Sequence, residues 1–160
     1  MTYRAFPLLA AFALSFALIS PPMTAQAAGC PIPFYGIFCA PLSLLDTAYG
    51  PIARAFQVSP GGNEARYGNY SLLRDEFLPL TDWAPIHSTQ EQLVRNVWAT
   101  DGISGTIRGY GSVDTEFGPA TWGVQFADFG SLGVLGRFGI YNFLSNTFYP
   151  EGDWRAPTTR

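Results

Sequence analysis

A change in hydrophobic periodicity restricts the fold of this chain more than any other feature of its sequence. Apolar and polar residues alternate over residues 103–117 and again over residues 120–128. A period of two is typical of β-strands that bury one face. A third, less regular strand follows, so the sequence predicts an antiparallel β-meander over residues 103–143.

Before this point, apolar residues recur at helical spacing. Residues 41–58 predict two short helices or one kinked helix, because a Gly-Pro pair interrupts the run. Residues 70–80 predict a brief helix that ends at a proline, and residues 88–100 predict a helix that opens with a capping box. The expected fold class is therefore α+β, with short N-terminal helices packed on the C-terminal antiparallel β-meander.

The first 27 residues have the organisation of a secretory signal peptide. Arg4 precedes an uncharged apolar run, and Ala25-Gln26-Ala27 has the small-x-small pattern of a cleavage site. An uncleaved N-terminal anchor is the alternative, although the run is short for a bilayer span. We expect a signal peptide over residues 1–27, a single exported domain over residues 28–150 and a flexible tail over residues 151–160.

Cys30 and Cys39 are the only cysteines of the chain. An even pair in an oxidising compartment indicates a disulfide bond, which we expect here. Lipidation of Cys30 is the alternative route to a membrane, but Ala27 stands where lipoprotein sites usually carry leucine, so it is not favoured. No metal site is expected, because two cysteines and His87, the single histidine, do not provide four zinc ligands.

Composition excludes several classes of partner. The chain has nine arginines, no lysine and a net charge of −3, which argues against nucleic acid. It has no phosphate-binding loop and no complete dinucleotide fingerprint, so no cofactor is expected. Low charge with many aromatics and glycines is typical of a periplasmic, cell-envelope or secreted β-rich protein. A small outer-membrane β-barrel is an alternative, but three predicted strands are fewer than the roughly eight it requires.

Polar side chains occupy alternate positions of the first predicted strand: Arg108, Tyr110, Ser112, Asp114 and Glu116. We interpret this row as the solvated face of the sheet. Asp114 and Glu116 would have Cα atoms about 6.5–7 Å apart on that face. A hydrolase of an envelope polymer that uses this carboxylate pair is therefore the alternative interpretation.

His87 would have to serve any nucleophilic triad, but the sequence has no Gly-x-Ser-x-Gly turn to go with it. We interpret His87 as a structural residue at the entry to a helix. No catalytic residue is assigned, and Asp114, Glu116 and His87 are the only candidates if the protein is an enzyme.

A non-catalytic binding or structural role is therefore the expected function. Exposed aromatic side chains provide stacking surfaces for sugars and proteins. The expected binding residues are Arg108, Tyr110, Tyr149 and Trp154. The expected partner is a protein or polysaccharide of the cell envelope.

Overall fold

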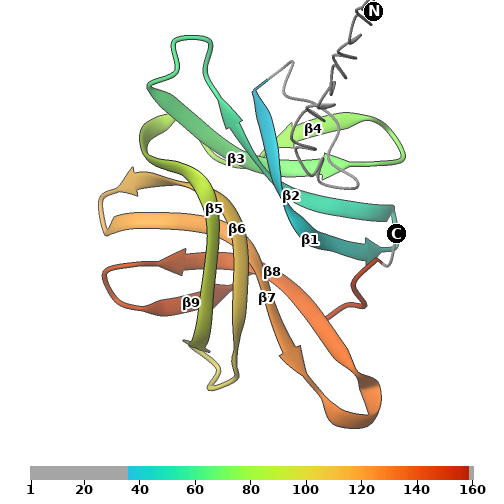
Figure 1. The fold of residues 1–160 in the computed structure, drawn as a ribbon. Coiled ribbons are helices and arrows are strands. Elements are labelled where there is room, and N and C mark those ends of the chain that lie inside the picture. The colour runs from blue at the N-terminus through green and yellow to red at the C-terminus, as the bar shows by residue number, and fades with distance from the viewer. Residues whose placement is uncertain (1–35, 159–160) are drawn as a thin grey trace, which may run out of the picture.

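The computed structural model describes residues 36–158, which form an almost entirely β structure (Figure 1). The signal peptide predicted over residues 1–27 and the predicted disulfide partner Cys30 lie outside the described residues. The strands are β1 (Ile37–Thr47), β2 (Gly50–Val58), β3 (Glu64–Ser71), β4 (Glu76–Pro79), β5 (Ala84–Ala99), β6 (Ser104–Thr115), β7 (Gly118–Asp128), β8 (Val134–Asn142) and β9 (Thr147–Pro150). One 3-10 helix, η2, spans Gly130–Leu132.

The predicted α+β fold class is wrong, because every segment predicted to be helical is a strand or a turn. Residues 41–58 belong to β1, β2 and their turn, and residues 70–80 belong mostly to β3, β4 and their turn. Residues 88–100 lie almost wholly within β5. The strands predicted over residues 103–143 are present as β6, β7 and β8, which pair antiparallel.

Bulges explain why β5 has the spacing of a helix. The register between β5 and β6 shifts three times, the last time between Val94 and Val97. A bulge adds one residue to a strand, so it lengthens the spacing of core-facing residues from two to three. Asn96 lies within this last bulge at φ 56. Val94 and Val97 therefore pack in the same core cluster, whereas Trp98 is 62% exposed.

Strand β2 is buried on both faces, which explains why its sequence did not indicate a strand. Ala53 and Ala55 pack in one core cluster, and Phe56 packs in another on the opposite face. A strand that is buried on both faces loses the alternation of polar and apolar residues. The Gly50-Pro51 pair was expected to kink a helix. Instead it begins β2 directly after a tight hairpin turn, and Gly50 has φ 89.

Strand pairing closes the sheet in two places. Strands β5, β6, β7, β8 and β9 form a closed ring, because β9 pairs with β8 and also with the end of β5. The start of β5 pairs instead with β3, which continues into β2 and β1. The segment after β9 then bridges Gly136 in β8 through Arg155 and Leu45 in β1 through Pro157. Figure 1 shows this C-terminal segment reaching β1.

The chain contains an internal repeat. Asp-Thr-Ala-Tyr-Gly-Pro at 46–51 forms the β1–β2 turn, and Asp-Thr-Glu-Phe-Gly-Pro at 114–119 forms the β6–β7 turn. In both turns the threonine hydroxyl donates to the glycine carbonyl, at 2.7 Å for Thr47 and 2.6 Å for Thr115. Strands β1 to β4 are paired in the same order and direction as β6 to β9. We refer to residues 37–87 as repeat 1 and residues 105–158 as repeat 2.

Side-chain contacts recur at equivalent positions of the two repeats. In repeat 1, Arg66 Nε donates to Gln57 Oε1 at 2.8 Å and its guanidinium lies 4.5 Å from the Trp83 ring centre. In repeat 2, Arg137 Nε donates to Gln125 Oε1 at 2.9 Å and the guanidinium lies 4.3 Å from the ring centre of Trp154. The repeat is thus present in side-chain packing as well as in topology.

Each repeat completes the sheet of the other. After β4, the chain of repeat 1 crosses to β6 of repeat 2, where Ile86 pairs with Val113. After β9, the chain of repeat 2 crosses to β1 of repeat 1, where Pro157 pairs with Leu45. Because of this exchange, residues 36–158 form one structural unit.

Candidate functional site

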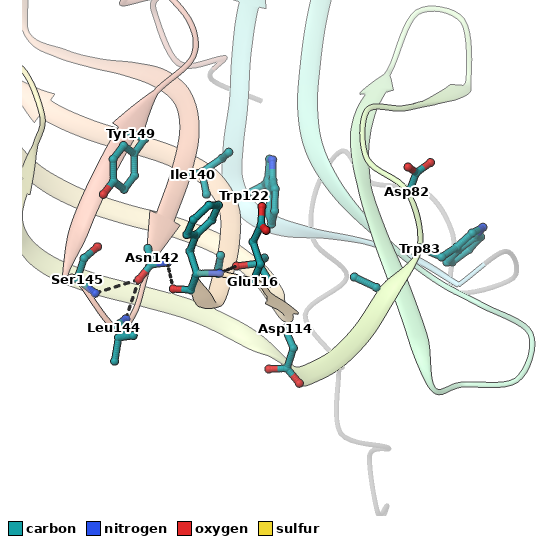
Figure 2. Close-up of a pocket in the computed structure, with 14 residues that line it drawn as sticks. Asp82, Trp83, Asp114, Glu116, Trp122, Ile140, Asn142, Leu144, Ser145 and Tyr149 are labelled. Atoms are coloured by element: carbon teal, nitrogen blue, oxygen red, sulfur yellow. Dashed lines mark hydrogen bonds between the residues drawn. The ribbon is translucent and has the colours of Figure 1, made fainter.

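A large open pocket, referred to below as the main pocket, lies beside the β6–β7 and β8–β9 turns (Figure 2). Its volume is about 950 Å³. The lining comes from the β4–β5 connection, the β6–β7 hairpin and the β8–β9 hairpin. The lining residues are Asp82, Trp83, Ala84, Asp114, Thr115, Glu116, Phe117, Ala120, Trp122, Ile140, Asn142, Leu144, Ser145 and Tyr149.

Aromatic and aliphatic side chains form most of the pocket wall. Phe117 is 72% exposed and Tyr149 is 45% exposed, which leaves their rings accessible to a ligand. Trp122 is held more firmly, because its ring stacks on the buried Tyr67 with ring centres 4.6 Å apart. The wall therefore combines a fixed aromatic ring in the sheet with accessible rings near the turns.

Two uncharged polar side chains of the pocket, Asn142 and Thr115, already bond within the fold. Asn142 Nδ2 donates to the Phe117 carbonyl at 2.8 Å, and Asn142 Oδ1 accepts from the backbone N–H groups of Leu144 and Ser145, each at 2.9 Å. Thr115 is committed to its turn in the same way. These bonds hold the two turns in place and leave few uncharged polar groups for a ligand.

The charged residues of the lining are all acidic. Asp82, Asp114 and Glu116 contribute carboxylates, and the pocket lining contains no arginine. Aromatic rings attract cations through the negative potential of their faces. The pocket thus favours a neutral or positively charged ligand over an anion.

The structure brings two of the three candidate catalytic residues into contact. His87 Nδ1 lies 3.0 Å from Asp114 Oδ1, and each side chain is about half exposed. At the equivalent position in the other repeat, Thr158 Oγ1 donates to Asp46 Oδ1 at 2.5 Å. A threonine replaces the histidine there, so the aspartate needs only a hydrogen-bond partner on the crossing strand. We therefore assign the His87–Asp114 contact to holding that strand in place.

Glu116, the third candidate, lies in the β6–β7 turn and lines the pocket together with Asp114. The polar row to which both belong does not form one solvated face. Ser112 is buried, because Gly111 takes φ 64 and the register with β7 shifts between Gly109 and Val113. This irregularity in β6 interrupts the alternation, so Asp114 and Glu116 do not continue one face with the polar residues before them.

The four predicted binding residues do not come together. Tyr149 lines the pocket described above, whereas Tyr110 stacks on Phe38 and lines a second pocket of about 820 Å³. Trp154 packs against Arg137 and is not among the residues that line either pocket. Arg108 lies in β6, where it pairs across the sheet with Leu93 and Val124. Of the four, only Tyr149 contributes to the main pocket.

Trp83, Phe117 and Trp122 are pocket residues that the sequence interpretation missed. Phe117 is mostly exposed, and Trp122 lines the pocket from β7. Trp83 reaches the pocket from the β4–β5 connection and also lines the second pocket. The repeated Asp-Thr-x-aromatic-Gly-Pro motif was the available signal, because it identifies the Phe117 turn as one of a pair.

No group of three or more histidine, cysteine, aspartate or glutamate side chains that could hold a metal ion occurs within residues 36–158. Over the same residues, no helix is long and apolar enough to cross a membrane. Cys39 is buried in β1, and its disulfide with Cys30 stays a prediction. No protein-family model, curated protein or solved structure matches this chain.

Proposed function

We propose that this chain is an exported, non-catalytic binding protein whose main pocket takes a ligand with an apolar body. One observation carries the proposal: accessible aromatic rings line an open pocket of about 950 Å³ in which the polar side chains of Asn142 and Thr115 are committed to the pocket's own turns. Ligand sites are usually concave and mainly apolar, with volumes of about 300–1,000 Å³.

This lining supports a small amphipathic ligand better than a polysaccharide. Sugar hydroxyls need directional donors and acceptors, and a site that leaves them unpaired loses affinity. Asn142 and Thr115 already bond to the backbone of the two turns. Asp82 and Glu116 contribute carboxylates to the lining, and Asp114, which also contacts His87, contributes a third.

A neutral hydrophobic fluorophore tests the pocket. We expect N-phenylnaphthylamine to bind the full mature protein and to fluoresce more strongly when bound. The variant Phe117→Ser removes an exposed ring from the pocket wall and should weaken binding by roughly three- to tenfold. Tyr49→Ser is the matched control, because Tyr49 occupies the equivalent turn of repeat 1 and is 77% exposed outside the pocket.

Two results would contradict the proposal. Failure of the wild-type protein to bind the fluorophore would remove the basis for an apolar site. Equal weakening by Phe117→Ser and Tyr49→Ser would show that the fluorophore binds exposed turns in general. Circular dichroism of both variants separates either result from a loss of fold.

Export is a separate part of the proposal and has its own test. We expect the exported protein to begin at Ala28 and to carry a Cys30–Cys39 disulfide. Intact-mass measurement should show both thiols blocked to alkylation until a reductant is added. A diacylglyceryl adduct on Cys30 would contradict this expectation and would indicate a lipid-anchored protein.

A further inference from the structure

The internal repeat supplies a built-in reference for the pocket, because each lining residue has an equivalent in the other repeat. Some pairs are identical or similar, as are Asp114 and Asp46, Thr115 and Thr47, and the turn aromatics Phe117 and Tyr49. These pairs belong to the hairpin turn that both repeats share. The pairs that differ are therefore the informative ones for ligand preference.

Three positions of the pocket lining have arginine as their equivalent in the other repeat. Trp122 is equivalent to Arg54, since each occupies the same place in its hairpin register. Ser145 is likewise equivalent to Arg74 in the strand-connecting turn, and Ala84 to Arg155 on the crossing segment. None of these three arginines therefore has a basic counterpart in the pocket lining.

A carboxylate also distinguishes the pocket from the equivalent surface. Glu116 lies in the β6–β7 turn, whereas the β1–β2 turn has Ala48 at that position. The pocket lining therefore carries three acidic residues and no arginine, while the equivalent positions carry two acidic residues and three arginines. The two sets of positions share a backbone plan and differ in the charges of their side chains, although Arg54 is buried and paired with Glu151.

Arg54 shows what the equivalent position does when it is not part of a pocket. Its side chain is only 4% exposed, its guanidinium donates to Glu151 at 2.9 Å and it lies 5.0 Å from the Phe138 ring centre. Burial lowers the pKa of Arg54, against the opposing effect of Glu151. At the pocket, the indole of Trp122 replaces this buried charge with an apolar surface beside three carboxylates.

We propose that the ligand of the main pocket is a cationic amphiphile, with an apolar body against the aromatic wall and an ammonium group beside Glu116. This inference rests on the proposed binding function and specifies its ligand class. A cation near a tryptophan or phenylalanine face gains roughly two- to fivefold in affinity at an exposed site, and an exposed ion pair adds a similar factor. Charge complementarity and the aromatic wall therefore select the same kind of ligand.

Three probes with the same eight-carbon chain separate charge from apolar binding. We use octyltrimethylammonium, octyl glucoside and octyl sulfate, each below its micelle concentration, and measure affinity by titration calorimetry on the full mature protein. The cationic probe should bind about tenfold more tightly than the neutral one. The anionic probe should bind most weakly, and added salt should weaken only the cationic probe's advantage.

The variant Glu116→Gln tests the source of the preference. We expect it to lower the affinity for the cationic probe by about three- to fivefold and to leave the neutral probe unchanged. Glu91→Gln is the control, because Glu91 is an exposed glutamate of β5 that does not line the pocket. Both substitutions remove one exposed carboxylate, so a general effect of net charge would affect both equally.

The possible results distinguish the two proposals. Equal binding of the cationic and neutral probes would overturn the cationic ligand class and leave the apolar pocket supported. Equal effects of Glu116→Gln and Glu91→Gln would also overturn it, because the preference would then arise from the whole protein. If none of the three probes binds, both this inference and the proposed function fail.

Discussion

The two repeats have an arginine at equivalent positions, Arg66 and Arg137, but Arg137 makes more hydrogen bonds. Arg66 in repeat 1 is half-buried, and it donates to Gln57 and lies over two aromatic rings. Arg137 in repeat 2 makes the equivalent contacts and also donates two hydrogen bonds to Asp101, at 2.5 and 2.9 Å. Its side chain is only 5% exposed. The bonded pair fixes the β5–β6 turn to β8.

This comparison separates the residues that form the fold from those that make the site. Residues shared by both repeats occupy turns, cross-strand pairs and the arginine–tryptophan contacts, where the backbone requires them. The repeats differ at many other positions, and some of these line the main pocket, where Trp122 and Glu116 occupy the positions of Arg54 and Ala48. One backbone plan thus supports a closed, ion-paired position in one repeat and an open, aromatic one in the other.

The largest expected difference between the repeats is the loss of stability when Arg137 or Arg66 is replaced. Arg137→Ala should lower the free energy of unfolding by about 3 kcal/mol, because it leaves the buried Gln125 Oε1 without its donor and removes the ion pair with Asp101. Arg66→Ala should cost only about 1 kcal/mol, since its guanidinium is less buried. Urea unfolding of both variants measures the difference. Equal losses would show that the extra bonds to Asp101 contribute nothing to stability.

Acid should reveal the same ion pair in the wild-type protein. The hydrogen bonds from Arg137 lower the pKa of Asp101 from 3.8 to about 2. The folded protein therefore binds fewer protons than the unfolded chain between these values, so stability decreases as the pH falls from about 4 to 2. Asp101→Asn should flatten this part of the stability profile, whereas Glu91→Gln should retain the wild-type profile. Identical profiles for all three proteins would contradict the role assigned to Asp101.

The two aspartates that hold the crossing strands provide a smaller test. Asp114→Asn and Asp46→Asn should each lower the free energy of unfolding by about 0.5–1 kcal/mol, since each weakens one partly exposed hydrogen bond. Similar losses support a shared structural role for the His87 and Thr158 contacts. A catalytic role for Asp114 would instead appear as a lost activity with little change in stability.

Parts of this fold could be predicted because their burial is simple. The sequences of strands β6 and β7 alternate and predicted strands, and β8 was predicted as a less regular third strand. Strand β2 is buried on both faces and β5 contains bulges, so neither shows a period of two. The same amphipathic spacing that indicates a helix arises here from irregular strands, and only the pairing partners distinguish the two.

The site was predictable only in its local components. Asp114, Glu116 and Tyr149 were identified as candidates, and all three line the main pocket. Trp83 and Trp122 reach it from segments whose approach depends on the crossing strands, which no local pattern encodes. The repeated motif at 46–51 and 114–119 could have related these segments, because residues that differ between repeats mark the position that has specialised.

The smallest expected effect concerns a turn residue that differs between the repeats while its contact is retained. Tyr70 donates its hydroxyl hydrogen to Asp75, and Tyr141 donates to Asn146 at 2.6 Å. Both acceptors have positive φ, 54 for Asp75 and 50 for Asn146. Aspartate and asparagine tolerate this conformation better than other side chains that have a Cβ.

Asp75→Asn should therefore change the free energy of unfolding by less than about 0.5 kcal/mol, because it keeps both the acceptor and the backbone preference. Burial, together with the Asp75 carboxylate, raises the pKa of Tyr70 to about 12. Removing the negative charge should lower that pKa, which ultraviolet titration of the tyrosines measures. Asp75→Ala is the matched control, since it loses the acceptor and strains the turn, and it should cost about 1–2 kcal/mol. If Asp75→Asn destabilised the protein as much as Asp75→Ala, the two turns would not be equivalent, and the repeat would hold for the backbone alone.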